Sequence, residues 1–216
     1  MKTFKLLTFL LVFPVLNVPG PVMGRAGVPL RDTLYRQGED CCIYIDRDGN
    51  SANVREFIDR VKPDRYVSIE VQDQIRKMKD NGIRLSHFDL GDLEGTYIRL
   101  RTIGGEKVTT GYVPHITYIS DSLIVWREFD SWSYVIRNVE RVPGAAVVET
   151  MSYSGEPVVF TIKEADPEKR VIEIGTDSSG YVPEGLYVHS DGACRFPHIV
   201  WECDGEPDGI RLPFED

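Results

Sequence analysis

Hydrophobic and polar residues alternate in short runs across the middle of the chain, from residue 112 to 162. Each run is rich in β-branched and aromatic residues and ends at a polar or glycine-containing turn, which is typical of β-strands. The runs span residues 114–119, 123–126, 134–140, 146–153 and 158–162. Because they follow one another closely and the turns between them are short, the pattern predicts an antiparallel meander.

Similar patterns on both sides of this stretch predict further strands, at residues 41–45, 66–71, 83–90, 97–103 and 171–174. Residues 107–110 are expected to pair back across Gly104-Gly105, and a slip of phase between Leu85 and Phe88 indicates a bulge. Residues 74–80 fit a helical turn or a strand edge equally well. Glycine, proline and acidic residues dominate after residue 175 and predict a loop-rich tail, in which short strands could form at 186–189 and 199–201.

Helical spacing is present in apolar residues that follow the first predicted strand: Val54, Phe57, Ile58 and Val61. We expect this helix to be capped by Asn50 or Ser51 and to end at Pro63. The polar turn before it, residues 46–50, does not match a calcium-binding EF-hand loop, because Phe57 stands where that loop needs an acidic ligand.

These patterns predict a mainly β (α+β) fold: an antiparallel meander sheet or a small sandwich or barrel, with one N-terminal helix and a loop-rich C-terminal tail. The expected division is a signal peptide at 1–24, a lead-in with a short strand and the helix at 25–63, a β domain at 64–175 and an acidic tail at 176–216. Residues 25–40 within the lead-in are rich in glycine, proline and charge, and are expected to be flexible.

The first 24 residues have the composition of a secretory signal. Lys2 and Lys5 precede an apolar run over residues 6–16, and small residues before Arg25 suit cleavage after Gly24. The run is short for a membrane span, although an uncleaved anchor is the alternative. We therefore expect a secreted, extracellular protein with no membrane span after cleavage.

The formal net charge of −9 argues against a nucleic-acid or anionic-membrane partner, since phosphate binding needs clustered Lys and Arg. An unidentified protein partner suits the chain better.

Four cysteines are present, Cys41, Cys42, Cys194 and Cys203, and an even number in a secreted chain predicts two disulfides. Of the three connectivities, the bond between adjacent Cys41 and Cys42 is the least favourable, because its ring is strained. Both remaining patterns tie the N-terminal strand to the tail. The alternative is a metal site built from Cys194, His198 and Cys203 with one residue of the N-terminal pair, although this spacing matches no common zinc signature.

Hydrolase, metalloprotease and nucleotide-binding motifs are absent from the sequence, which predicts no catalytic residues and no cofactor. Trp126 is expected to anchor the core, with a ligand platform as the alternative. His87, His115 and His189 stand alone and are expected at the surface or in turns. The rival function is a thiol- or metal-dependent secreted enzyme with its site near Cys194, His198 and Cys203; a bacterial periplasmic inhibitor or binding protein is a third alternative.

The order of these strands resembles the FAINT domain, which occurs in secreted and surface proteins of Theileria parasites. The resemblance rests on the strand at 67–71, Gly111-Tyr112, the strand holding Ile116 and Ile119, Leu123-Ile124-Val125-Trp126, the strand at 134–139 and the hairpin at 155–160. It covers about residues 66–174, and Ser120-Asp121-Ser122 stands where the family often has Asp-Gly. The resemblance implies a secreted, non-enzymatic β-rich module that acts at a host interface, in some family members after export to the host cell.

Overall fold

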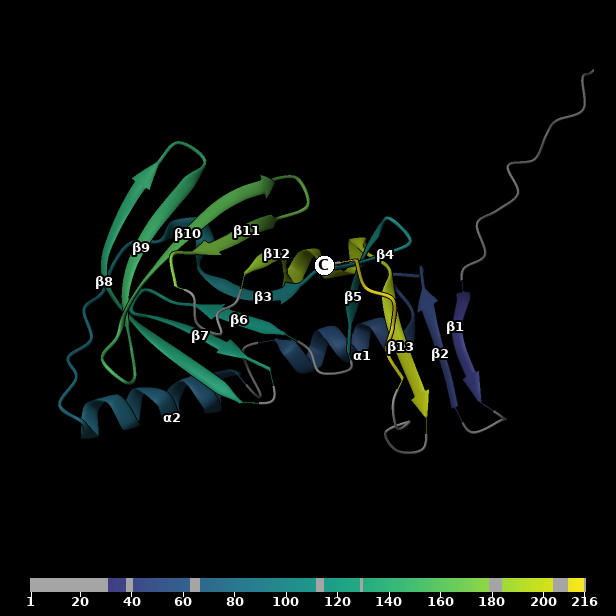
Figure 1. Ribbon diagram of the computed structural model, residues 1–216, viewed down its shortest axis with the longest axis horizontal. Helices are drawn as coiled ribbons and strands as arrows, with labels where there is room; N and C mark the ends of the chain where they lie inside the picture. Colours follow the sequence, from purple (N-terminus) through teal and green to yellow (C-terminus); the bar gives the residue numbers. More distant parts are fainter. Residues whose placement is uncertain are drawn as a thin grey trace, which may run out of the picture.

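The computed structural model describes residues 31–37, 41–62, 67–111, 115–128, 130–178, 184–203 and 210–215, so the predicted signal peptide at 1–24 lies outside the described residues. Two β structures lie side by side: a closed barrel, and a smaller sheet on the right in Figure 1. The prediction of a mainly β fold is confirmed. Of the three expected forms, an open meander sheet, a sandwich or a barrel, the structure has the barrel.

Eight strands of the described chain form the barrel, and each pairs antiparallel with both neighbours. In order around the ring they are β3 (Gly95–Arg99), β6 (Ile116–Ile119), β7 (Leu123–Arg127), β8 (Ser131–Val142), β9 (Ala145–Ser152), β10 (Pro157–Asp166), β11 (Val171–Thr176) and β12 (Gly185–His189). The run from β6 to β10 is the antiparallel meander that the sequence predicts. Pairing of β12 with β3 closes the ring, so this barrel has no open edge along those two strands.

The smaller sheet takes its strands from three distant parts of the chain. Their order is β1 (Arg31–Gln37), β2 (Cys41–Asp46), β13 (His198–Cys203), β5 (Glu106–Thr110) and β4 (Arg101–Ile103). β13 runs antiparallel to β2 and parallel to β5. The expectation of a flexible lead-in is wrong for residues 31–37, because β1 pairs with β2 along its length.

Inward-facing side chains fill the barrel. Phe160, Ile136 and Tyr187 have no exposed area, and they belong to one apolar cluster that receives residues from every barrel strand. An eight-stranded barrel has an interior just wide enough for side chains or for one small ligand, and here side chains occupy it. Trp126 is 2% exposed, and its ring stacks on that of Trp132 with 4.6 Å between ring centroids.

Two helices cover part of the outer surface of the barrel. α1 (Ala52–Val61) begins where the Ser51 side chain accepts a hydrogen bond from the Val54 N–H, as the sequence predicts. α2 (Val67–Asp80) buries Val71 and Met78 against the barrel wall. Figure 1 shows α2 beneath the barrel, and α1 nearer the smaller sheet. Neither helix is long and apolar enough to cross a membrane.

The strand predicted at 66–71 is wrong, because residues 67–71 form the first part of α2, and the fold therefore has a second helix. Alternation over so short a segment also fits a helix, and the apolar spacing of Val71, Ile75 and Met78 is helical. The strand predicted at 83–90, with its bulge, is also wrong. That segment is extended, and its apolar residues pack on the barrel, but the Phe88 N–H bonds the Asp121 carbonyl outside any strand ladder.

The tail, expected to be mostly loop with short strands possible, has regular elements that the barrel and the smaller sheet use. Residues after 175 supply β12, which the barrel needs for closure, then the short 3-10 helix η2 (Ser190–Arg195) and β13. The short strands considered at 186–189 and 199–201 both form. The predicted strand at 97–103 divides at Leu100, whose N–H bonds Leu186 of the barrel before the chain enters the smaller sheet as β4. The hairpin across Gly104-Gly105 is confirmed.

Candidate binding pocket at the rim of the barrel

A pocket of about 460 Å³ lies at one end of the barrel, between β8, the β9–β10 turn and α2. We call it the rim pocket. The described residues that line it share aromatic, hydroxyl or amide chemistry, with one cation: Gln74, Lys77, Ser131, Trp132, Ser133, Tyr134, Ser152, Tyr153 and Ser154. Its volume falls within the range of about 300–1,000 Å³ that is usual for small-molecule sites.

Strand register creates this pocket. The pairing of β8 with β9 stops at Tyr134 and Ser152, while β8 continues beside β7 as far as the pair of Ser131 with Arg127. Residues 131–133 therefore extend past the end of β9 and pair with β7 alone. Because side chains alternate along a strand, Trp132 and Tyr134 point into the barrel while Ser133 points outward beneath α2.

Hydrogen bonds fix the β9–β10 turn that forms one wall. The Ser152 hydroxyl accepts a bond from the Glu156 N–H at 3.0 Å, and the Ser152 carbonyl accepts one from the Gly155 N–H at 3.0 Å. Asn81, just after α2, donates its side-chain N–H to the Tyr153 hydroxyl at 3.0 Å. The turn is thus linked to α2 across the mouth of the pocket.

The aromatic side chains of the pocket rest on the barrel core. Trp132 is half-buried and stacks on Trp126, and Tyr134 meets Phe160 edge-on at 5.0 Å between centroids. Burial raises the pKa of Tyr134, so its hydroxyl stays protonated at neutral pH and can donate a hydrogen bond. Tyr153 differs from both, because it is 55% exposed.

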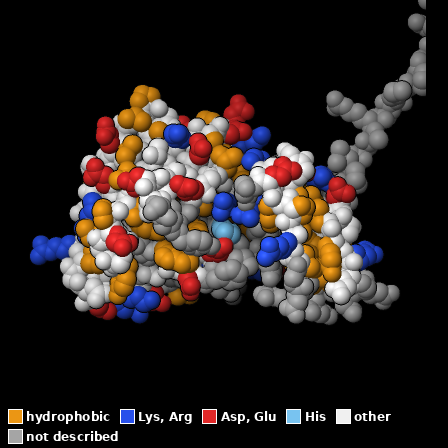
Figure 2. Space-filling model, viewed as in Figure 1, with side chains coloured by type: hydrophobic (Ala, Val, Ile, Leu, Met, Phe, Trp, Pro, Cys, Tyr) orange, Lys and Arg blue, Asp and Glu red, His pale blue; other side chains and the backbone are white. Residues whose placement is uncertain are grey.

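Two polar groups of the pocket have unused bonding capacity. The Ser133 side chain is buried, at 3% exposure, and its hydroxyl oxygen has no hydrogen-bond partner within the described chain. The ammonium of Lys77 makes no ion pair with any described residue, and no carboxylate is among the described residues that line the pocket. Elsewhere charges are mixed: on the face in Figure 2, Lys and Arg side chains are scattered among Asp and Glu.

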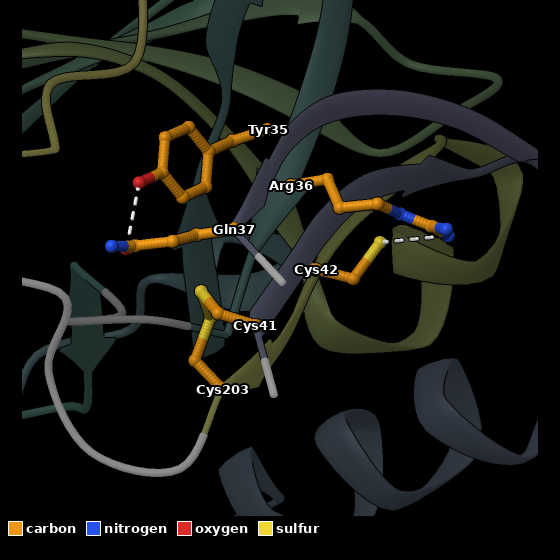
Figure 3. The surroundings of a disulfide bond; sticks show 6 residues. All are labelled: Tyr35, Arg36, Gln37, Cys41, Cys42 and Cys203. Carbon is orange, nitrogen blue, oxygen red and sulfur yellow. Dashed lines mark hydrogen bonds between the residues drawn. A yellow bond between two sulfur atoms is a disulfide. The ribbon is translucent and has the colours of Figure 1, made fainter. Parts of the chain in front are cut away.

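The cysteines form one disulfide. Cys41 and Cys203 lie opposite each other on β2 and β13 and are bonded, with Cys42 beside them (Figure 3). Cys42 and Cys194 remain thiols. A disulfide between the N-terminal strand and the tail was expected, and the Cys41–Cys203 bond confirms it. The expectation of a second disulfide is wrong. Cys42 is the second residue of β2, whereas the Cys194 carbonyl lies against Gly49, beyond the far end of that strand. Four residues of strand span about 13 Å, well beyond the Cα separation of about 7 Å that a disulfide allows.

The residues considered for a thiol or metal site are not brought together. His198 and Cys203 stand at opposite ends of β13, and the sulfur of Cys203 is held in the disulfide. Cys194 is exposed on η2. Within the ranges that the structure describes, no group of His, Cys, Asp and Glu residues has the arrangement of a metal site.

His198 has a structural environment instead. It is 3% exposed, its ring stacks on Phe57 with centroids 4.4 Å apart, and its Nδ1 lies 2.9 Å from the Thr109 hydroxyl. Burial lowers its pKa to about 4; nearby Asp46 opposes this shift and Arg60 adds to it. At neutral pH the ring is therefore uncharged.

The other histidines differ from one another. His87 is exposed and lies 2.6 Å from the Asp121 carboxylate, as a surface residue would. His115 is largely buried and pairs with Glu128 at 2.9 Å. His189 was expected at the surface or in a turn; it lies at the end of β12, directly before η2, and is 8% exposed, and burial lowers its pKa.

The rim pocket residues, Trp132 and Tyr134 among them, were not among the candidate site residues. The sequence does contain a pattern that marks these residues. Serine and aromatic residues alternate in two places, Ser131-Trp132-Ser133-Tyr134 and Ser152-Tyr153-Ser154. These two stretches lie about twenty residues apart in the sequence, and only the register of β8 with β9 places them at one opening.

No protein-family model matches this chain, and no curated protein matches it. Among solved structures, a similar one is the crystal structure of Treponema pallidum Tp0751 (pallilysin), at 9% sequence identity and a TM-score of 0.36. The match covers 58% of this chain and 98% of the Treponema chain. A likeness this distant indicates nothing about function.

Proposed function

We propose that this protein is a secreted, non-enzymatic β-barrel module that binds a partner at a host interface through its rim pocket. The observation that carries the proposal is the pocket itself, a recess with aromatic walls and hydroxyl groups on a barrel whose interior is already filled. Small-molecule and partner sites commonly combine apolar walls with a few placed polar groups.

The chemistry of the pocket supports binding over catalysis. The serine hydroxyls are candidate nucleophiles, but no histidine or carboxylate among the described lining residues could act as their base. Of the three residues of the rival site, Cys194 and His198 lie on other parts of the fold, and the sulfur of Cys203 is held in the disulfide. The geometry therefore favours a module that recognises a ligand without altering it.

Two features support secretion. The first 24 residues have the pattern of a signal peptide, and disulfides such as Cys41–Cys203 are typical of oxidising compartments. The host interface comes from the resemblance to the FAINT domain of Theileria proteins. Strands form at 116–119, 123–127 and 131–142, where that pattern has them, although the segment that opens it, at 67–71, is helical.

Expression of the full chain in a eukaryotic secretory host tests export. Intact mass should start near Arg25, with two thiols available to alkylation before reduction and four afterwards. Retention in the cell at full mass would contradict secretion.

Binding is tested with the labelled, secreted protein on cultured host cells. We expect saturable binding that Tyr153→Ala weakens about tenfold, since loss of an exposed aromatic anchor commonly costs this much. Val142→Ala is the matched control, because Val142 is also an exposed apolar residue, 43% exposed, and lies outside the rim pocket. Thermal melting should show that both variants are folded. Non-saturable binding, or equal binding by wild type and Tyr153→Ala, would refute the proposal.

A further inference from the structure

We infer that the rim pocket binds an acidic sugar residue, a compact polyhydroxylated ring that carries one carboxylate, as sialic and uronic acids do. The inference rests on the proposed binding function and adds the chemical class of the ligand. Three properties of the pocket carry it: the packed core beneath it, its serine hydroxyls beside the exposed Tyr153 ring and the half-buried Trp132 ring, and the one cation among its described lining residues.

The barrel core limits the ligand to a compact molecule. Inward from Tyr134 the interior is occupied by Phe160, Ile136 and Val148, none of which has exposed area. A long acyl chain would need a tunnel through these side chains, and packed interiors do not open one without cost. The pocket volume of about 460 Å³ accommodates one ring with its substituents.

The serine hydroxyls match a ligand that both donates and accepts hydrogen bonds. Four serines line the pocket: Ser131, Ser133, Ser152 and Ser154. The hydroxyls of Ser152 and Ser154 lie 2.9 Å apart and form a pair. The buried Ser133 hydroxyl oxygen has no hydrogen-bond partner in the described chain, which is an uncommon state for a buried polar atom. The other serine hydroxyls suit sugar hydroxyls, because each can both donate and accept a hydrogen bond.

The exposed rings supply the apolar part of the site. Tyr153 is 55% exposed, yet Asn81 holds its hydroxyl, so the ring is fixed in orientation while its surface stays available. Trp132 is half-buried on the other side of the opening and is fixed by its stack on Trp126. Rigid aromatic faces of this kind accept the C–H face of a ring at little cost in conformational entropy.

The single cation indicates a single anionic group. Lys77 lines the pocket without an ion pair to any described residue, and Gln74 lies one helical turn before it. On a chain with a net charge of −9, a pocket with a lysine and no carboxylate among its described lining residues favours an anion. A phosphate polymer would need several clustered cations, so one carboxylate fits better than a nucleic acid.

Titration of the secreted, full mature protein with N-acetylneuraminic acid and glucuronic acid tests this assignment, with galactose as the neutral probe. Saturation-transfer NMR detects contact with each sugar, and calorimetry measures affinity. Lys77→Gln should weaken binding of the acidic sugars about tenfold, because it removes a charge-assisted hydrogen bond, and should change any galactose binding less than about twofold. Lys79→Gln makes the same charge change on the same helix outside the pocket, and should leave all affinities unchanged.

Absence of binding by both acidic sugars at about 10 mM, or equal affinity in wild type and Lys77→Gln, would overturn the assignment. Preference for galactose over the acids would also overturn it. If the acidic sugars fail while saturable, Tyr153-dependent binding to cells persists, the ligand class is wrong and the binding function stands. If cell binding fails as well, both are wrong. Because Lys77 is exposed, its substitution should leave the fold intact, which thermal melting checks.

Discussion

Acidification should destabilise this protein through His198. The ring is 3% exposed under α1, where it stacks on Phe57 and meets the Thr109 hydroxyl. Burial disfavours the charged form, so the pKa falls from 6.5 to about 4 in the folded state. The unfolded chain therefore binds the proton more tightly than the folded chain. The contribution of the uncharged His198 ring to the unfolding free energy is fully present above pH 6.5 and is lost as the pH falls towards 4.

The size of this effect follows from the pKa difference. A pKa difference of one unit between the folded and unfolded states corresponds to about 1.4 kcal/mol. Because the His198 pKa is 6.5 in the unfolded state and about 4 in the folded state, acidification to well below pH 4 should lower the unfolding free energy by about 3 kcal/mol. At pH 5 the loss is about 2 kcal/mol. Because domains are stable by about 5–15 kcal/mol, this is a large share of the total.

Urea unfolding between pH 7.5 and 4.5, followed by tryptophan fluorescence, measures the loss. The control is His198→Phe, which keeps an aromatic ring against Phe57 and removes the titration. His189, whose pKa burial also lowers, is present in both proteins, so the difference between their pH slopes isolates His198. We expect a steeper loss of stability in the wild type. Equal losses in the two proteins would refute the argument from burial.

Three further predictions concern the cysteines and their surroundings. Replacing both Cys41 and Cys203 with serine should lower the unfolding free energy by up to about 5 kcal/mol, because the disulfide joins residues 162 positions apart in the sequence. Urea titration measures this loss, and a loss under about 1 kcal/mol would contradict the prediction. In the native protein, iodoacetamide should modify exposed Cys194 before Cys42, as peptide mass mapping would show, whereas the reverse order would contradict their placement. Gly49→Ala should destabilise the fold by about 1–3 kcal/mol in thermal melts, since a Cβ there would lie 1.9 Å from the Cys194 carbonyl oxygen; an unchanged melting temperature would contradict that close approach.

Local patterns predicted the elements whose periodicity is long or repeated. The strands from β6 to β10 and helix α1 agree with their alternating or helical spacing, because each buries one face against a core that lies next to it. Two alternating patterns failed. Residues 67–71 alternate like a strand, yet the helical spacing of Val71 with Ile75 and Met78 places them in α2. Residues 83–90 have the alternation of a strand but do not join a ladder.

The sequence by itself determined a mainly β fold with an antiparallel meander and one capped helix, since these depend on hydrophobic periodicity and capping residues that are close in the chain. Only the tertiary structure decided barrel closure by β12, the pairing of Cys41 with Cys203, and the rim pocket. The physical reason is common to all three. Each depends on which strand lies beside which and in what register, and such pairing between distant residues leaves no local pattern in the sequence.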